Sequence, residues 1–288
     1  MLIAWGTWGD RMGRSAGGLE DLASKKRKGG ARATSLLGTS LVDEALATMP
    51  DVDSTIEQGF SSITAQGFTA SKARTEFGTW LVAAHKAVEE AHRRAETQAL
   101  DHLVDLLIER AGAGPVGETK FDLHEYVRGF LRRAAPDFVA FEFRSGQARK
   151  SRAGSVWEKI GTRFLKWNEI PCEKPTGANA RSLRQIDRVV PSVQVALDTP
   201  DRAIRLSFKT EAREKWRVLI DEGRRGHVYL VTLGEDVTHD RLKEMAESRL
   251  VVYVPSAIKE GDEVFRKNSA LRPLDDLPRD LRRYVPSL

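Results

Sequence analysis

Two short runs of β-branched and aromatic residues most constrain the fold of this chain. They are VYLVT at residues 228–232 and LVVYV at residues 250–254, and each has the length and composition of a buried strand. Residues 241–248, which lie between them, have a helical pattern. Strands that alternate with helices are typical of α/β folds, so the sequence predicts an α/β second half.

The first half is predicted to be helical. Residues 71–111 repeat apolar side chains at spacings of three and four, which predicts one long helix or two consecutive helices. The segment AGAGP at 111–115 ends this element, and helical spacing resumes over 122–133. Beyond Pro136 the pattern is mixed, and an amphipathic helix is expected over 153–167.

Shorter elements complete the second half. The β-branched segments at 186–190 and 203–208 predict two further strands, and residues 212–220 predict another helix. The expected organisation is an N-terminal arm over 1–45 and a single domain over 46–288, divided into a helical part at 46–135 and an α/β core at 136–288.

The composition fits a globular protein of a reducing compartment. Among 288 residues, 46 Lys and Arg face 41 Asp and Glu, which gives a net charge of +5, and 41% of the residues are hydrophobic. A single cysteine, Cys172, excludes intramolecular disulfides and multi-cysteine zinc sites. Because the chain shows neither a run of about 18 apolar residues nor a secretory signal, we expect a cytoplasmic protein with no membrane contact.

The N-terminal arm has two open interpretations. It combines the glycine pairs at 17–18 and 29–30 with the basic run KKRK at 25–28. Such a run is either a solvated linker or an arm that follows the phosphate backbone of a nucleic acid.

Three residues in the second half have the chemistry of phosphodiester hydrolysis. Asp187 and Glu222 offer carboxylate oxygens, which are the ligands that Mg²⁺ prefers. Lys209 closes the predicted strand at 203–208 and is the candidate for orienting the attacking water. Taken alone, such a triplet is common in a chain with 30% charged residues.

A charged triplet begins four residues after Lys209. Arginine and lysine donate to guanine O6 and N7, and glutamate accepts from cytosine N4, so Arg213, Glu214 and Lys215 have the chemistry to read adjacent G·C pairs. The alternative is an exposed helix face with ion pairs.

A second basic stretch runs into the predicted helix at 153–167. It has four cations and no acid in nine residues, namely Arg144, Arg149, Lys150 and Arg152, which are candidates for phosphate contacts. Gln147, within this stretch, is a candidate for contact with a base edge.

Together these residues resemble the type II restriction endonucleases of the PD-(D/E)xK fold, in the branch that contains SsoII, PspGI, EcoRII and NgoMIV. Ser207 replaces the usual acid two residues before the catalytic lysine, and the compensating acid stands thirteen residues downstream at Glu222. The resemblance covers about residues 140–225. It implies a central mixed β-sheet flanked by helices, a Mg²⁺ cofactor, and a supporting carboxylate at Glu158.

The resemblance also implies a DNA target. The triplet at 213–215 would read a CC:GG half-site, most closely within a CCNGG-like palindrome whose central bases are flipped out. Each flipped base would stack on a platform formed by Arg74, Phe77 or Trp80, although a core position is the commoner role for an aromatic side chain.

The expected partners follow from this resemblance. They are double-stranded DNA, a second copy of the chain in a homodimer or a tetramer, and a companion DNA methyltransferase of the same prokaryotic system without direct contact. Two alternatives remain open: another nuclease of the same fold, acting in repair or on junctions, or a non-catalytic basic DNA-binding protein.

Overall fold

The computed structural model describes residues 40–111, 123–211, 216–234 and 237–285. The basic run at 25–28 and the triplet Arg213, Glu214 and Lys215 therefore lie outside the described residues. None of the helices in the described ranges carries a stretch that is long and apolar enough to span a bilayer.

A five-stranded mixed sheet forms the centre of the α/β half, in the spatial order β1-β2-β3-β4-β5. The strands are β1 (Arg188–Val190), β2 (Ile204–Lys209), β3 (His227–Thr232), β4 (Leu250–Val254) and β5 (Leu271–Pro273). β1 pairs with β2 in antiparallel orientation, and the remaining pairs are parallel. This confirms the predicted mixed sheet, whose antiparallel strand lies at one edge.

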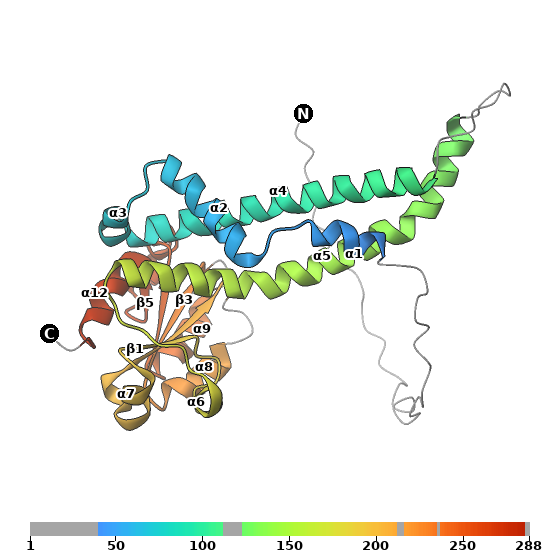
Figure 1. Cartoon of the computed structure of the whole chain (residues 1–288). Coiled ribbons are helices and arrows are strands. Elements are labelled where there is room, and N and C mark those ends of the chain that lie inside the picture. The colour runs from blue at the N-terminus through green and yellow to red at the C-terminus, as the bar shows by residue number, and fades with distance from the viewer. Residues whose placement is uncertain (1–39, 112–122, 212–215, 235–236, 286–288) are drawn as a thin grey trace, which may run out of the picture. The chain divides into compact units, whose positions relative to one another are not determined.

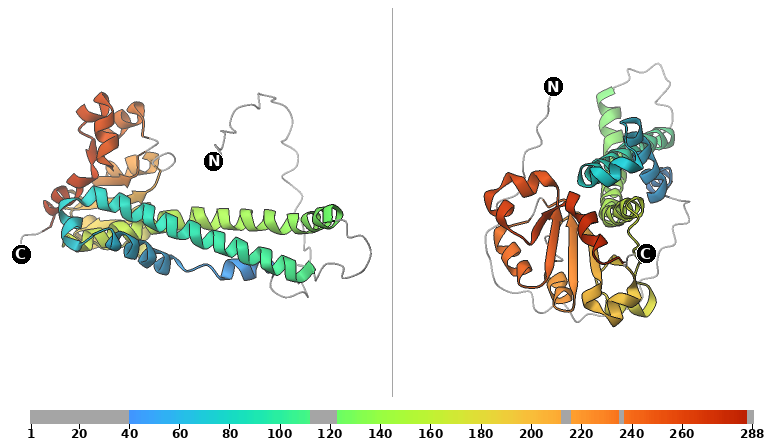
Figure 2. Two further views of the ribbon diagram at one scale, coloured as in Figure 1. Left: turned by 90° about the horizontal axis from the view of Figure 1, so that it is seen from above. Right: turned by 90° about the vertical axis from the view of Figure 1, so that its left-hand side faces the viewer.

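Helices cover both faces of this sheet (Figures 1 and 2). One face packs against α7 (Val193–Asp198), α8 (Trp216–Gly223) and α9 (His239–Ala246) in an apolar core that includes Val189, Leu230 and Val252. The other face packs against α2 (Val52–Ala65), α4 (Phe77–Ala111) and α5 (Leu123–Trp167) in a second core. The helices of the first half are α1 (Leu41–Ala47), α2 (Val52–Ala65), α3 (Ala70–Thr75), α4 (Phe77–Ala111) and α5 (Leu123–Trp167).

The helix α5 differs from the sequence-based expectation. The sequence predicts separate helices over 122–133 and 153–167, but one helix of 45 residues runs through Pro136. A proline inside a helix removes one hydrogen bond and usually kinks it, and Figure 1 shows the green start of α5 bent away from the rest. Packing of Ala134 and Phe141 against Leu103 of α4, in a third apolar cluster, offsets this cost.

Close packing of α5 on the sheet depends on a glycine. A Cβ atom added at Gly161 would lie 2.2 Å from the ring of Phe208. Only a residue without a side chain lets α5 approach the end of β2 so closely. The indole nitrogen of Trp157 donates to the carbonyl of Val231 at 3.0 Å, which ties α5 to β3 as well.

The chain beyond β4 adds elements for which the sequence made no prediction. They are α10 (Ser256–Gly261), α11 (Glu263–Lys267), strand β5, the 3-10 turn η2 (Leu274–Asp276) and α12 (Leu277–Arg282). Each has three to six residues, too few to show a period. Two further short elements are α6 (Gly177–Ser182) and the 3-10 turn η1 (Pro200–Arg202).

Candidate active site

Asp187 and Lys209 meet where β2 ends. Asp187 precedes β1, and its backbone N–H donates to the carbonyl of Leu206 at 2.8 Å, which extends the antiparallel pairing to this residue. Lys209 Nζ lies 2.6 Å from Asp187 Oδ2. The same oxygen accepts from the backbone N–H of Phe208 at 2.7 Å. The carboxylate therefore has a fixed position, with an ammonium group beside it.

Glu222 lies near the end of α8 and is 4% exposed. Its Oε2 atom is 3.4 Å from Arg205 Nη1, and the same guanidinium nitrogen donates to the Glu222 backbone carbonyl at 3.2 Å. Arg225 is a second partner, 3.6 Å from Oε1. Burial raises the pKa of the Glu222 carboxyl above its ordinary value, and the two arginines act against this rise.

Asp187 and Glu222 are held at the same face of β2. Side chains alternate along a strand, so Arg205, Ser207 and Lys209 share the face opposite to that of Leu206. Asp187 stands opposite Ser207, and Glu222 contacts Arg205, which lies two residues, or about 7 Å, along the strand. The structure thus brings Asp187 and Lys209 into contact, and it holds Glu222 at a neighbouring position by way of Arg205.

Glu158 reaches this site indirectly. It lies on α5, where its carboxylate is ion-paired with Arg188 and with Lys174, the latter at 2.9 Å. Arg188 Nη1 also donates to the backbone carbonyl of Asp187 at 2.8 Å. Arg188 therefore links Glu158 to Asp187. Among the described residues, the acid paired with Lys209 is Asp187, not Glu158.

The acids are chemically suited to a hard divalent cation. Mg²⁺ takes oxygen ligands and is commonly held by one or two carboxylates together with waters and substrate phosphates. Asp187, which precedes β1, and Glu222, on α8, provide this donor type at one face of β2. In the described ranges no group of three or more His, Cys, Asp or Glu side chains is placed to hold a metal ion.

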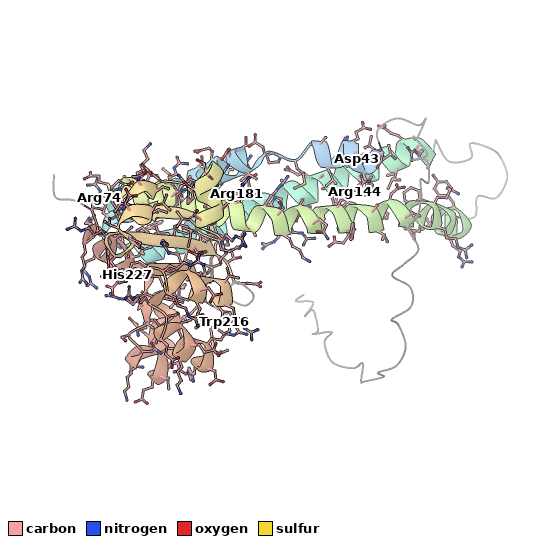
Figure 3. The ribbon with its side chains drawn as sticks, turned by 90° about the horizontal axis from the view of Figure 1, so that it is seen from below. Asp43, Arg74, Arg144, Arg181, Trp216 and His227 are labelled. Carbon is pink, nitrogen blue, oxygen red and sulfur yellow. The ribbon has the colours of Figure 1, made fainter. Side chains whose placement is uncertain are left out.

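A cavity of about 380 Å³ lies beside Glu222. Among the residues that the structure describes, its lining includes Arg181, Arg184 and Arg225 together with two acids, Asp221 and Glu222 itself. Figure 3 shows Arg181, whose side chain is exposed at the surface. These three arginines were not predicted from the sequence as site residues; they lie outside the two basic stretches and come from two segments, 181–184 and 224–225.

The basic stretch on α5 is largely engaged within the protein. Arg144 is ion-paired with Asp43 of α1 (Figure 3), and Arg149 contacts Glu96 of α4 at 3.1 Å. Arg152 donates to His92 Nδ1 at 3.2 Å. Gln147 and Lys150 are exposed side chains of the same helix.

The three proposed stacking residues have different environments. Phe77 is 1% exposed and packs edge-on against Phe164 with ring centroids 5.6 Å apart, which places it in the core. Trp80 is half-buried, and its indole nitrogen donates to Glu76 at 3.2 Å. Arg74 is exposed and forms an ion pair with Glu169 at 2.6 Å.

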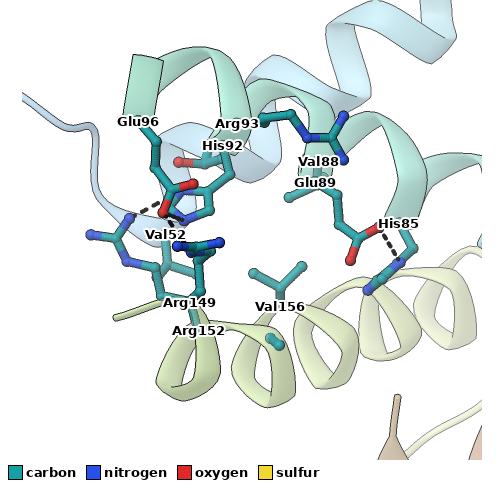
Figure 4. A pocket seen from close by; sticks show the side chains of 12 residues that line it. Val52, His85, Val88, Glu89, His92, Arg93, Glu96, Arg149, Arg152 and Val156 are labelled. Carbon is teal, nitrogen blue, oxygen red and sulfur yellow. Dashed lines mark hydrogen bonds and ion pairs between the residues drawn. The ribbon is translucent and has the colours of Figure 1, made fainter. Parts of the chain in front are cut away.

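A second cavity of about 380 Å³ separates α4 from α5 (Figure 4). Two histidines of α4 line it, and burial lowers the pKa of both His85 and His92. Glu96 lies 3.5 Å from His92 Nε2 and bonds Arg149 on the facing helix. The polar groups of this cavity therefore join the two helices, away from Asp187 and Glu222.

Arg205 and Arg188 are contacts of the candidate site that were not predicted from the sequence. Both arginines stand at positions with strand character, where a single charged residue gives no recognisable motif. Arg205 carried one usable signal: it interrupts the apolar strand pattern IRLSF beside Ser207. A charged residue within an apolar strand pattern suggests a buried partner, but the partner can be identified only when the helix that packs on that face of the strand is known.

Known families and relatives match most of this region. Residues 117–272 match the family described as EcoRII C terminal. The type II restriction enzyme SsoII of Shigella sonnei is 23% identical over 204 residues, which make up 67% of this chain. The match covers 62% of SsoII, so the chain spans less than two thirds of that relative's length.

Two solved structures share the fold of this chain. Metal-depleted Ecl18kI in complex with uncleaved DNA has a TM-score of 0.69 at 18% identity, and the match covers 85% of this chain and 82% of Ecl18kI. A complex of the restriction endonuclease PspGI with substrate DNA has a TM-score of 0.60 at 16% identity, covering 86% of this chain and 98% of PspGI. The likeness shows the restriction-endonuclease fold over a longer part of the chain than the motifs at 140–225.

Proposed function

Because the chain belongs to the EcoRII C-terminal family, we propose that it is a type II restriction endonuclease that hydrolyses double-stranded DNA with a divalent metal ion. The observation that carries this proposal is the contact between Asp187 and Lys209 at 2.6 Å, with Glu222 held on the same strand face. These are the three positions at which the sequence matches the motif of the SsoII branch. The similarity to SsoII, which is named as a type II restriction enzyme, supports the same assignment.

Each residue of the site has a distinct part in this mechanism. Asp187 and Glu222 would hold Mg²⁺, which supplies a polarised water and neutralises charge on the scissile phosphate. Lys209 Nζ, fixed by Asp187 Oδ2, would orient the attacking water and donate to the phosphate oxygen. Glu158 would support this arrangement through Arg188, since the two residues form an ion pair.

The DNA contacts are proposed for two regions. Arg213, Glu214 and Lys215 would read a CC:GG half-site in the major groove. Gln147 and Lys150 are exposed on α5, so they can reach a base edge and a phosphate without losing an internal partner shown in the structure. Arg144, Arg149 and Arg152 would have to exchange their partners Asp43, Glu96 and His92 for phosphates.

The complete target and assembly extend this proposal. A CCNGG-like palindrome is read by a two-fold dimer, in which each subunit supplies one active site. The central bases would be flipped, with Trp80 as the platform, because Phe77 is buried. A companion methyltransferase would protect the host DNA in the prokaryotic cytoplasm.

Plasmid cleavage tests the function directly. The purified chain, incubated with plasmid DNA and Mg²⁺, is expected to give discrete fragments whose ends map to one CC:GG-containing palindrome. The Asp187→Ala variant serves as the control for a contaminating nuclease and should give none. Structure-specific nicking would assign the protein to repair or junction nucleases, and retardation of DNA without cleavage would make it a binding protein.

A further inference from the structure

Arg205 is an unusual residue for the middle of a sheet. It lies in β2, is 5% exposed, and faces the same side as Ser207 and Lys209. A buried guanidinium is costly unless it is paired, and replacing a buried ion pair by apolar residues is often neutral or stabilising. The stability of the sheet alone therefore gives no reason for an arginine at this position.

The contacts of Arg205 reach two helices, α8 and α7. Nη1 donates to both the carbonyl and the carboxylate of Glu222, at 3.2 and 3.4 Å. Nη2 donates to the carbonyl of Ala196 at the facing helix α7. The guanidinium therefore fixes the side chain of Glu222 and the backbone of α8 at the same time.

The opposite side of α8 is fixed by close packing. A Cβ atom added at Gly223 would lie 2.0 Å from the carbonyl oxygen of Ser248, so α8 abuts the start of β4 without a gap. Arg205 holds the helix from the β2 side. Glu222, between these two contacts, has little freedom to move along the sheet.

This arrangement compensates for the place of the acid in the sequence. An acid at position 207 would be fixed by β2 itself, but Ser207 stands there and the acid lies on α8 instead. Its position relative to Asp187 then depends on how α8 docks on β2. The contact of Arg205 with the Glu222 carboxylate joins α8 to β2 and so fixes the position of the helix on the strand.

We infer that Arg205 is a positioning residue, which holds Glu222 and its helix against β2 so that Glu222 and Asp187 can serve one metal ion. This inference rests on the proposed nuclease function. It concerns a residue that does not itself touch the metal or the DNA. Arg205 also places a positive charge near the metal, and this effect alone predicts the opposite result when the arginine is removed.

The test compares Arg205→Lys and Arg205→Met in the full-length chain. Mn²⁺ binding is measured from the electron paramagnetic resonance signal of the free ion, without DNA. Loss of a group that orients a metal ligand commonly weakens metal binding by about 10–100-fold. We expect a loss of Mn²⁺ affinity in this range for Arg205→Met and a smaller loss for Arg205→Lys, which keeps the positive charge. If the methionine variant does not fold, the lysine variant carries the test. The Mg²⁺ concentration that half-saturates cleavage should rise in the same order.

Two control variants separate positioning from other effects. Arg225→Met removes the second cation beside Glu222, but its side chain is 67% exposed, so Mn²⁺ affinity should change less than about threefold. Arg272→Met breaks another ion pair to a buried acid, Asp280, far along the chain from the site. It should lower the melting temperature without changing Mn²⁺ affinity.

A double variant locates the effect. In the Glu222→Gln background, Arg205→Met should add no further loss of Mn²⁺ affinity, since the carboxylate that it positions is already gone. Unchanged or tighter Mn²⁺ binding by Arg205→Met, or an equal loss in both backgrounds, would overturn the inference. Failure of the wild-type chain to bind Mn²⁺ and to cleave plasmid would instead overturn the proposed function.

Discussion

At the scale of single residues, every acid of the candidate site has a basic partner within the protein. The partners keep the carboxylates ordered before any metal ion binds, and burial of Glu222 makes its partner necessary. A metal ion would have to share these carboxylates with their basic partners. We therefore expect metal binding to be accompanied by small shifts of the paired lysine and arginine side chains. The pairs are Asp187–Lys209, Glu222–Arg205 and Glu158–Arg188.

The contact between Asp187 and Lys209 leads to the first prediction. Asp187→Ala and Lys209→Ala should each lower the rate of cleavage by about 10²–10⁴-fold, because metal binding and orientation of the water depend on both groups. Binding of the target duplex in Ca²⁺, measured by gel retardation, should persist in both variants. Near-normal cleavage by the Lys209 variant would remove the lysine from the mechanism.

A second prediction at this scale concerns the charged triplet. Arg213→Ala and Glu214→Ala should each weaken binding to a CC:GG duplex by about 1–3 kcal/mol for every base that the variant no longer reads, and should leave binding to a scrambled duplex unchanged. Arg217→Ala is the matched control, since Arg217 is an exposed residue of the neighbouring helix α8. Titrations at one fixed salt concentration give both values. An equal loss on the two duplexes would mean that Arg213 contacts phosphate.

At the scale of elements, α5 joins the helical part to the sheet. It contacts α4 in both its first and its second half, and it meets the end of β2 at Gly161, next to the residues of the candidate site. Phe208, whose ring fills the space above Gly161, also donates its backbone N–H to Asp187. The position of α5 and the geometry of the site are therefore coupled through Phe208, in addition to the link from Glu158 to Asp187 through Arg188.

Substitution at Gly161 tests this coupling. Gly161→Ala should lower the free energy of unfolding by about 1–3 kcal/mol, because the added methyl group collides with Phe208, and cleavage should fall with it. Gly154→Ala, on the same helix, is the control. It has no atom within 4 Å of the added Cβ and should raise stability by about 1 kcal/mol. Urea unfolding curves provide the comparison, and similar effects of the two variants would contradict the coupling.

The stability that the interface of α4 and α5 contributes should depend on pH. Burial lowers the pKa of His85 and of His92 below the ordinary value of 6.5, and Arg152 and Arg149 lower that of His92 further. The folded protein then binds fewer protons than the unfolded chain, so the stability contributed here is present above pH 6.5 and is lost as the pH falls toward the folded pKa. Glu96 has a raised pKa and acts in the opposite direction.

A histidine variant isolates this contribution. The melting temperature of the wild type should fall between about pH 7.5 and pH 5.5, and His92→Gln, which cannot titrate, should reduce the fall. His102→Gln is the control, because His102 lies on α4 outside the lining of this cavity. Identical pH profiles for the wild type and the His92 variant would assign the fall to other groups.

The same elements show which parts of the fold and of the candidate site could be predicted from the sequence. Runs such as VYLVT and LVVYV identified β3 and β4 because a buried strand has a strong local signal. The expectation of separate helices over 122–133 and 153–167 was wrong, since tertiary packing of α5 on α4 carries one helix through Pro136. Asp187 and Lys209, two residues of the motif, are in contact in the structure, whereas the tie between Glu222 and Arg205 depends on the docking of α8, which leaves no pattern in the sequence.

At the scale of the whole molecule, the proposed target raises a question of distance. A central base pair between two CC:GG half-sites adds about 3.4 Å of rise between the scissile phosphates of the two subunits. A dimer suited to a continuous site can accept the longer one if the central bases leave the stack, because the flanking pairs then move together at the cost of unstacking. Trp80 is half-buried, with its ring 5.3 Å from that of Phe68 and Lys72 Nζ 5.1 Å from its ring centroid, so a flipped base that stacks on Trp80 would take the place of Lys72.

The last prediction places a fluorescent base at that centre. A CCNGG duplex with 2-aminopurine at the central position should change strongly in fluorescence when the protein binds it in Ca²⁺, since 2-aminopurine is quenched within the stack. Trp80→Ala should alter the signal of the bound state, whereas Trp80→Phe, which keeps a ring, should alter it less. Phe77 offers no such surface, because it is 1% exposed and packs on Phe164. If a saturated complex keeps the stacked-base signal, the subunits must instead adjust to an unperturbed duplex, and the longer target would then require a wider separation of the two active sites.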